Sequence, residues 1–452
     1  MSDASAPADI DLKVVTSCDL GQELKQFRCM EINLGQGRKG ILAAYGADRV
    51  VDPWVEMFFF PTDTLKLVVF TLDGDVLWRK DLGRGVVPGG HFCPILAFDL
   101  DGDGVDEIWY VDNLDPDHPL SIRNRCLRRL DAQTGESTGH WPWLWHVWGD
   151  RPSHQFRNFI LGGKVHGDPV LVTAQGTYTN MRLEGWLPSM EQRWDVKIAA
   201  DAPGARGSHM SPIVDINNDG VDELMWGERC IELDTGRELF CCDRDSYRGH
   251  SDVIQPVWDQ QAGRWFIYTC RESDNDASPR VALFDDRGRR VWGAVDTGHM
   301  DMGWTARIGP DMRHVAMAIR IGGKSLGPDG LFHESPEQFA FDALSGSPVE
   351  LAFDAYRTRP VDINGDGYHE FVRVGNDDGC EVLSSKGNTV GQVPGRVALA
   401  KKFCDLPGEQ LLSYHSSGQV QIIADANASD SEEALARYGN GFYRPAQPVA
   451  GI

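Results

Sequence analysis

The sequence predicts an all-β fold, a seven- or eight-bladed β-propeller built of four-stranded antiparallel blades. The 452-residue chain contains 49 glycines and 14 tryptophans, a composition that suits many tight turns and large side chains packed between sheets. One acidic loop occurs three times, and each copy precedes a strand-like run such as residues 108–111. Segments that open with a histidine, or once with Arg357, recur at spacings of 41 to 69 residues. Such spacings match four-stranded blades better than the helical units of a solenoid.

Charge and hydrophobicity exclude several classes of protein. The formal net charge is −23, with 25% charged and 41% hydrophobic residues, which is typical of an acidic globular protein. A general binder of nucleic acid or of anionic membranes is therefore not expected. No run approaches 18 apolar residues, and the first 15 residues lack a signal-peptide pattern. Together with ten scattered cysteines, which fit free thiols, these features predict a cytoplasmic protein without a membrane span.

The repeated loop has the oxygen spacing of a calcium site. Side-chain oxygens occupy its first, third, fifth and ninth positions, and a glycine that permits a tight turn occupies the sixth. An EF-hand would need a glutamate at the twelfth position and flanking helices, whereas strand-like runs flank these loops. The sequence thus predicts up to three structural calcium sites. Their ligands would be Asp99, Asp101, Asp103 and Glu107; Asp215, Asn217, Asp219 and Glu223; and Asp362, Asn364, Asp366 and Glu370.

The opening histidines predict a site at the channel. The first strand of each propeller blade lines the central channel, so residues that enter these strands converge around one mouth. Adding a unit before the first opening and the strand-rich piece 397–425 gives eight units, or seven if the terminal pieces share a blade. We expect one cooperative propeller at 41–425, with 1–40 contributing to blade closure and 426–452 as an extension. The opening histidines are His91, His140, His209, His250 and His299.

The oversized segment 140–186 predicts sugar binding and proton transfer. Tryptophan faces can stack on pyranose rings, while arginine and histidine hold carboxylates and hydroxyls. Packing between blades is the alternative for most of the tryptophans. The segment contains Trp141, Trp143, Trp145, Trp148, His146, His154, Arg157, His166 and Tyr178.

A second group of polar residues lies at 243–272. Tyr247, His250 and Arg271 could supply a proton carrier and a clamp for a carboxylate. Zinc is a lesser hypothesis, because the spacing is not that of a zinc ribbon or finger. The zinc ligands would be Cys241, Cys242, Cys270 and His250.

These features together resemble the β-propeller polysaccharide lyases, which include ulvan, rhamnosyl-glucuronate and rhamnogalacturonan lyases. The loops are similar to the FG-GAP type of propeller calcium loop, and the resemblance spans about residues 40–425. It implies β-elimination of an acidic oligosaccharide or polysaccharide at a rhamnose–glucuronate type of linkage. In the ulvan-type enzymes two histidines, a tyrosine and an arginine carry the site. The resemblance assigns these roles to His146, His166, Tyr247 and Arg271, and His154 and Tyr178 compete for them.

The implied chemistry removes the C5 proton beside the uronate carboxylate and expels the O4-linked sugar. Arg271 or Arg157 would neutralise the carboxylate, and a neutral histidine or Tyr247 would take the proton. A rhamnosidase-like glycoside hydrolase and a non-catalytic carbohydrate-binding propeller are the alternatives. Residues expected to contact substrate are His91, His154, Arg157, Tyr178, His209, His250, His299 and Arg320.

Overall fold

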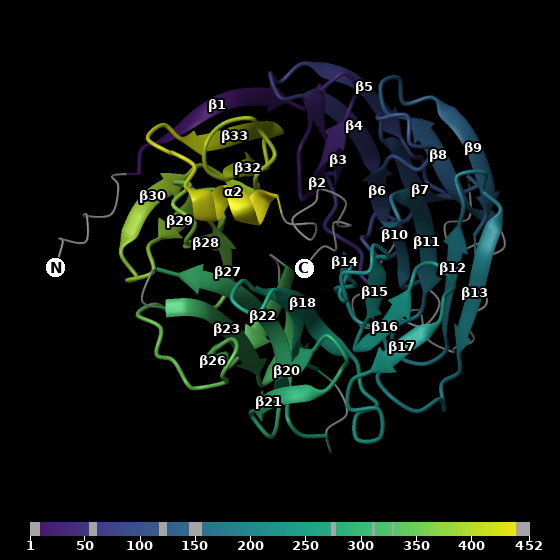
Figure 1. The fold of residues 1–452 in the computed structure, drawn as a ribbon. Helices are drawn as coiled ribbons and strands as arrows, with labels where there is room; N and C mark the ends of the chain where they lie inside the picture. The colour runs from purple at the N-terminus through teal and green to yellow at the C-terminus, as the bar shows by residue number, and fades with distance from the viewer. Residues whose placement is uncertain are drawn as a thin grey trace.

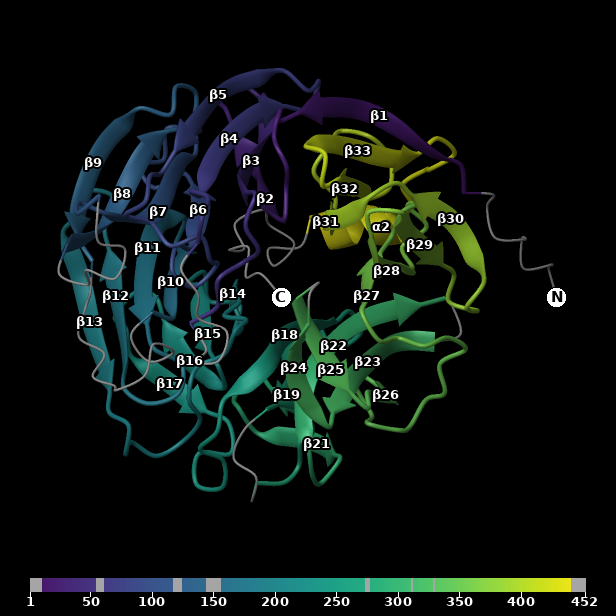
Figure 2. The ribbon, with the colours of Figure 1, turned by 180° about the vertical axis from the view of Figure 1, so that it is seen from behind.

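The described strands form eight antiparallel blades around a central axis, seven of four strands and one of three, and a separate two-stranded sheet is inserted into the three-stranded blade (Figures 1 and 2). The computed structural model describes residues 10–53, 61–116, 124–143, 156–272, 277–309, 312–327 and 330–439. The predicted propeller is confirmed, and its blade number is eight. Within the described residues no helix is long and apolar enough to cross a membrane.

Within the first seven blades the strands follow the chain from the axis outward, and a two-stranded hairpin is inserted into the sixth. Blades one to four contain β2 (Gln26–Asn33), β3 (Lys39–Gly46), β4 (Lys66–Thr71) and β5 (Val76–Asp81); β6 (Ile95–Phe98), β7 (Glu107–Asn113), β8 (Arg125–Asp131) and β9 (Ser137–Pro142); β10 (Asn158–Val165), β11 (Asp168–Gln175), β12 (Met181–Trp186) and β13 (Gln192–Ile198); and β14 (Ile213–Val214), β15 (Glu223–Trp226), β16 (Arg229–Glu232) and β17 (Glu238–Cys241). Blades five to eight contain β18 (Ser251–Asp259), β19 (Arg264–Arg271), β20 (Val281–Asp285) and β21 (Arg290–Ala294); β22 (His299–Ile308), β23 (Met312–Ile321) and β26 (Glu337–Asp342), with the hairpin β24 (Gly323–Gly327) and β25 (Gly330–Glu334); β27 (Thr358–Val361), β28 (Glu370–Asn376), β29 (Gly379–Leu383) and β30 (Thr389–Val393); and β31 (Arg396–Lys401), β32 (Gln410–Tyr414), β33 (Gln419–Asp425) and β1 (Leu12–Asp19).

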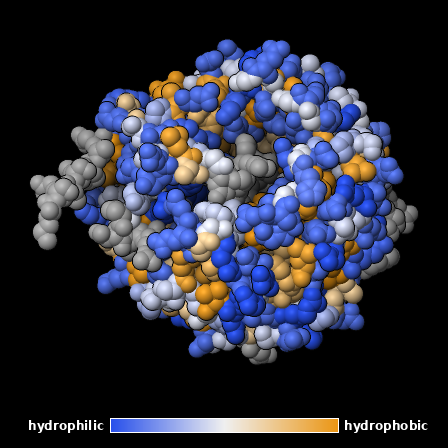
Figure 3. All heavy atoms as spheres, in the orientation of Figure 1, coloured by the Kyte–Doolittle hydropathy of each residue, from blue (hydrophilic) through white to orange (hydrophobic). Residues whose placement is uncertain are grey.

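The hydrophobic core lies between adjacent blades. Inner strands such as β3 are almost wholly buried, because both of their faces pack against neighbouring sheets. Outer strands such as β5 alternate between half-buried and exposed residues. One core cluster, for example, joins Met30 of the first blade to Tyr110 of the second. Because the apolar side chains pack between the blades, hydrophilic residues cover much of the molecular face shown in Figure 3.

The first strand closes the ring. β1 pairs with β33 in an antiparallel ladder, and the Asp11 backbone N–H donates to Asp425 Oδ1 at 2.8 Å. β2 already belongs to the first blade, so blade strands begin before residue 41. The helix α2 (Glu432–Tyr438) follows β33. The first and last strands of the described chain thus pair within one blade.

Deleting residues 1–19 is expected to destabilise the propeller strongly. The deletion removes the β1–β33 ladder, whose hydrogen bonds each contribute about 0.5–1.5 kcal/mol, and it exposes an edge strand. Denaturant unfolding should show a loss of several kcal/mol, with increased aggregation. The control is Val15→Ser, because Val15 is 46% exposed on the same strand. An unchanged unfolding midpoint in the truncated protein would contradict this role for β1.

Candidate functional site

Four of the five opening histidines meet at one mouth of the channel. His91 and His209 lie just before β6 and β14, and His250 and His299 lie at the start of β18 and β22. The ring centroids of His91 and His209 are 5.3 Å apart, and those of His209 and His250 are 4.8 Å apart. His140 is different, because it lies on the outer strand β9. The repeat therefore brings four imidazoles together at the starts of the inner strands β6, β14, β18 and β22.

Arg157 and Tyr178 join His209 at this mouth. They adjoin the ends of β10 and β11, where Asn158 pairs with Gln175. Arg157 Nη1 lies 3.2 Å from His209 Nδ1, and the Tyr178 hydroxyl lies 3.4 Å from His209 Nε2. Both ring nitrogens of His209 thus face polar groups.

A second set of charges continues around the same mouth. His250-Ser-Asp252 and His299-Met-Asp301 occupy equivalent positions at the start of adjacent inner strands. Residues two apart in a strand share a face, so each histidine lies beside its aspartate. His299 Nε2 is 3.2 Å from Asp301 Oδ1 and 2.9 Å from Glu272 Oε1. The result is a compact group of imidazoles and carboxylates.

The inserted hairpin β24–β25 completes this group (Figure 2). Lys324 and His333 are cross-strand partners in it. Lys324 Nζ contacts Asp301 and lies 3.4 Å from Glu272 Oε1, while His333 Nε2 lies 2.9 Å from Asp301 Oδ2. Sequence reasoning missed Lys324 and the carboxylates, although the repeated His-x-Asp tripeptide was a signal that could have found the two aspartates.

Burial and charge push the pKa values of neighbouring histidines apart. Burial, reinforced by Arg157, lowers the pKa of His209 well below its usual value, and it lowers that of His91 in the same way. Burial also acts on His250, but Glu272 and Asp252 outweigh it and raise the pKa of His250 to about 9. Neutral and charged imidazoles side by side are typical of sites that move protons.

The carboxylates also form a set of ligands that could hold a divalent cation. Asp252 and Glu272 belong to two overlapping groups, one with His209 and His250 and the other with His299 and Asp301, whose ligand atoms lie within 4.8 Å of one another. Asp252 Oδ2 is buried and has no hydrogen-bond partner among the described residues, as expected for an oxygen that faces an ion. Mixed imidazole and carboxylate donors suit manganese or zinc better than calcium, which prefers oxygen ligands alone. The cysteines of the alternative zinc set, Cys241, Cys242 and Cys270, are buried free thiols outside both groups.

Tyr247 and Arg271, predicted to be catalytic, lie behind the site. The Tyr247 hydroxyl donates to the His250 carbonyl at 2.5 Å, and the Arg271 guanidinium lies 4.1 Å from the Tyr247 ring centroid. Arg271 donates to both carboxylate oxygens of Glu228, at 2.8 and 2.6 Å. Neither Tyr247 nor Arg271 is exposed to solvent. They support the start of β18, and in this structure substrate cannot touch them.

Of the other predicted residues, those that the structure describes, His166 and Arg320, do not join this mouth. His166 lies in the β10–β11 turn, at the far end of β10 from Arg157, and its N–H donates to Gly220 in a calcium-type loop. An eight-residue strand such as β10 spans about 26 Å. Arg320 pairs with Glu337 on the neighbouring strand of its own blade. His146 and His154 lie outside the described residues.

The calcium-type loops lie at the opposite mouth, between the first and second strands of their blades. In all three, the glycine at the sixth position donates to the first aspartate, at 2.9 to 3.0 Å. The ninth-position glutamate accepts a bond from the second residue of each loop. In the first loop Asp99, Asp101 and Asp103 gather within 4.8 Å, and the second loop places Asp215, Asn217 and Asp219 in the same bonding pattern. These two loops fit a calcium ion.

The fold and the site together define an eight-bladed β-propeller whose mouth is lined by histidines and carboxylates. Comparison with known proteins gives three findings. A model of the C-terminal domain of rhamnogalacturonan lyase family 11 matches residues 61–113. The rhamnogalacturonan exolyase YesX of Bacillus subtilis (strain 168) is 25% identical over 320 residues, which are 63% of this chain and 51% of YesX. The endolyase YesW of the same organism is 24% identical over 286 residues, 55% of this chain and 44% of YesW.

Solved structures agree on the fold. Exotype rhamnogalacturonan lyase YesX superposes with a TM-score of 0.74 at 19% identity, covering 92% of this chain and 76% of that one. The Bacillus licheniformis rhamnogalacturonan lyase PL11 gives 0.70 at 17% identity with the same coverage. The chain spans about half the length of the curated relatives it matches. It is therefore similar to the β-propeller rhamnogalacturonan lyases, and the predicted resemblance is confirmed.

Proposed function

We propose that this chain is a polysaccharide lyase that cleaves a rhamnose- and uronate-containing, pectin-type saccharide by β-elimination. The observation that carries the proposal is the meeting of His209, Tyr178 and Arg157 with a set of carboxylates at one mouth of the propeller. The rhamnogalacturonan lyases among its relatives support the choice of substrate. Lyase activity is also what the sequence predicted, but the proposal gives the catalytic roles to His209, Tyr178 and Arg157 instead of the residues that the sequence suggested.

Three roles follow from the geometry. A uronate loses the proton next to its carboxylate, and the developing negative charge needs a nearby cation. Arg157 and Lys324 supply positive charge in the site, although each is already paired with carboxylates: Arg157 with Asp52, and Lys324 with Asp301 and Glu272. His209, kept neutral by burial and Arg157, is placed to take the proton, and the Tyr178 hydroxyl 3.4 Å away is placed to protonate the leaving oxygen.

Asp252 and Glu272 would hold a divalent cation in this site. When bound, it would add positive charge beside the substrate carboxylate and so stabilise the enolate-like intermediate. Lys324 and His299 hold the Glu272 carboxylate in position, at 3.4 and 2.9 Å. His250 holds Asp252 through a 3.1 Å contact from Nε2. These contacts fix the direction of both carboxylates before any ion or substrate arrives.

Incubation with rhamnogalacturonan oligosaccharides tests the activity. A lyase produces an unsaturated uronate, which absorbs in the ultraviolet, and its product masses add up to that of the substrate. A glycoside hydrolase would add one water and give no absorbance. A non-catalytic propeller would bind the saccharide without either change. Absence of new absorbance across a panel of uronate-containing saccharides, with folded protein, would overturn the proposal.

We also propose that the first two loops bind structural calcium. Saturation of one site at a hundred times its dissociation constant stabilises a protein by about 2.7 kcal/mol. We therefore expect calcium to raise the melting temperature and a chelator to lower it. The double variant Asp103→Asn with Asp219→Asn should lose much of this response. Asp405→Asn, at a side chain that is 89% exposed, is the control and should keep it.

A further inference from the structure

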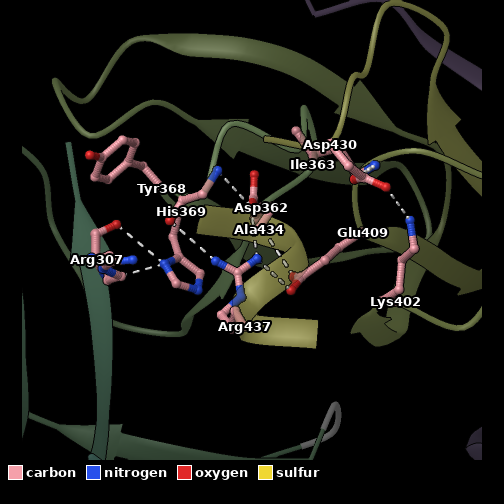
Figure 4. A network of polar contacts seen from close by, with 12 residues as sticks. Arg307, Asp362, Ile363, Tyr368, His369, Lys402, Glu409, Asp430, Ala434 and Arg437 are labelled. Atoms are coloured by element: carbon pink, nitrogen blue, oxygen red, sulfur yellow. Dashed lines mark hydrogen bonds and ion pairs between the residues drawn. The ribbon is translucent and has the colours of Figure 1, made fainter. Parts of the chain in front are cut away.

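The third calcium-type loop, between β27 and β28, differs from the other two in being covered. Asp362 is fully buried and Asn364 is 7% exposed, whereas Asp101, the counterpart of Asn364 in the first loop, is exposed; the fifth-position residues Asp366 and Asp103 are exposed in both loops. The cover is helix α2, which lies over this loop (Figures 1 and 4). The same motif therefore stands in a different environment in the seventh blade.

Arg437 of α2 reaches the acidic centre of this loop (Figure 4). Its Nη2 lies 2.7 Å from Asp362 Oδ2 and 3.0 Å from Glu409 Oε1. Its Nη1 donates to the Gly367 carbonyl at 3.2 Å. Asp362 and Glu409 are both buried, so a cation between them offsets two charges that would otherwise repel in a medium of low dielectric constant.

The helix is fitted closely to the loop. The Ser431 side chain caps α2, and the Ser431 N–H donates to the Gly365 carbonyl at 2.7 Å. A Cβ atom on Gly367 would lie 2.6 Å from Glu433 Cβ, so only glycine allows this approach. Lys402 pairs with Asp430, just before the helix, at 3.0 Å. The position of Arg437 is therefore set by several independent contacts.

The loop also differs from the other two in the residue before its glutamate. Its eighth position is His369, where the other loops have Asp106 and Asp222. The side chains of Asp106, Asp222 and His369 each accept a hydrogen bond from a backbone N–H of the preceding blade. For His369, Nδ1 accepts from the Arg307 N–H at 3.1 Å. The eighth position is therefore not a calcium ligand. What weakens calcium binding is the Arg437 guanidinium, which places a positive charge against the ligand Asp362.

We propose that Arg437 is the resident cation of the third loop, which closes without calcium while the first two loops bind it. The inference builds on the calcium proposal for those two loops and does not depend on the lyase activity. The competing arrangement is a calcium ion bound beside Arg437. Asp362 Oδ1 could be its ligand, since this oxygen is buried and has no hydrogen-bond partner among the described residues. The two arrangements differ in the number of ions per chain.

Calcium stoichiometry of the full chain separates them. After removal of divalent ions with a chelator, titration calorimetry should give two calcium ions per chain. Arg437→Ala should raise the number to three and make the melting temperature more dependent on calcium. Lys402→Ala is the matched control, because it removes a contact of the same segment without touching Asp362, and it should remain at two.

Three ions in the unmodified chain would overturn the proposal, as would a folded Arg437→Ala protein that gains none. If that variant does not fold, the double variant Asp103→Asn with Asp219→Asn decides: we expect its remaining calcium binding to be lost, and one retained ion would overturn the proposal. If the unmodified chain binds no calcium, the proposal for the first two loops fails. In that case the third loop is still tested by whether Arg437→Ala binds one more calcium ion than the unmodified chain.

Discussion

Glu228→Ala is expected to reduce the free energy of unfolding by about 3–5 kcal/mol, because it leaves the Arg271 guanidinium buried without its main partner. Glu228 and Arg271 have no solvent exposure and form two hydrogen bonds with each other. Glu228 Oε1 also accepts bonds from Ser251 and Thr269, both at 3.0 Å, so the deletion removes the centre of a network. Denaturant unfolding measures the loss directly.

Glu337→Ala is the control for this prediction. It breaks the ion pair with Arg320, but Glu337 is 53% exposed, so the cost should not exceed about 1 kcal/mol. A second variant tests the cause. Glu228→Leu combined with Arg271→Met removes both buried charges and should be more stable than Glu228→Ala alone. If Glu228→Ala and the unmodified protein have equal free energies of unfolding, the ion pair of Glu228 with Arg271 does not stabilise the fold.

His209→Ala is expected to lower kcat on rhamnogalacturonan oligosaccharides by about 10²–10⁴-fold, and Tyr178→Phe by a similar factor, because each removes a proton-transfer group. His209 is mostly buried and contacts Arg157 and Tyr178, so the unfolding midpoint of each variant is measured as well, to separate a loss of folding from a loss of catalysis. The rate is followed as the rise of ultraviolet absorbance, together with KM for the same substrate.

The control for these variants is a substitution of His166, which lies at the opposite mouth of the channel. His166→Asn changes a histidine that the sequence suggested as catalytic, and asparagine tolerates its positive φ of 52°. We expect His166→Asn to retain the activity of the unmodified protein. If His166→Asn loses activity and His209→Ala retains it, the catalytic histidine is His166, as the sequence predicted, and not His209.

The repeat made much of the fold predictable. Each copy of the acidic loop is followed by the second strand of a blade, and in four blades a small residue and a histidine stand at or shortly before the start of the inner strand. These regularities predicted the propeller and the meeting of His91, His209, His250 and His299. His140 entered the series wrongly because Gly-His also occurs on the outer strand β9.

The residues proposed for catalysis were less predictable, because spacing in sequence does not tell which side of a blade a residue faces. Tyr247 and Arg271 have the right chemistry, but Glu228, 43 residues from Arg271, holds them in the interior. Tyr178 and Arg157 have the same chemistry, and both contact His209 at the mouth. Lys324 and His333 reach the site on a hairpin inserted into the sixth blade, which departs from the repeat.

The pairing of β1 with β33 bears on how the protein folds. Asp11 and Asp425, which form one of its bonds, are 414 residues apart in sequence. Loop closure over such a separation is slow, so the ring is completed only after nearly all of the chain is available. Once formed, the same ladder has to break before the first and last blades separate. The closed ring should therefore refold slowly and unfold slowly, and its half-life at high temperature would depend on the rate of that opening.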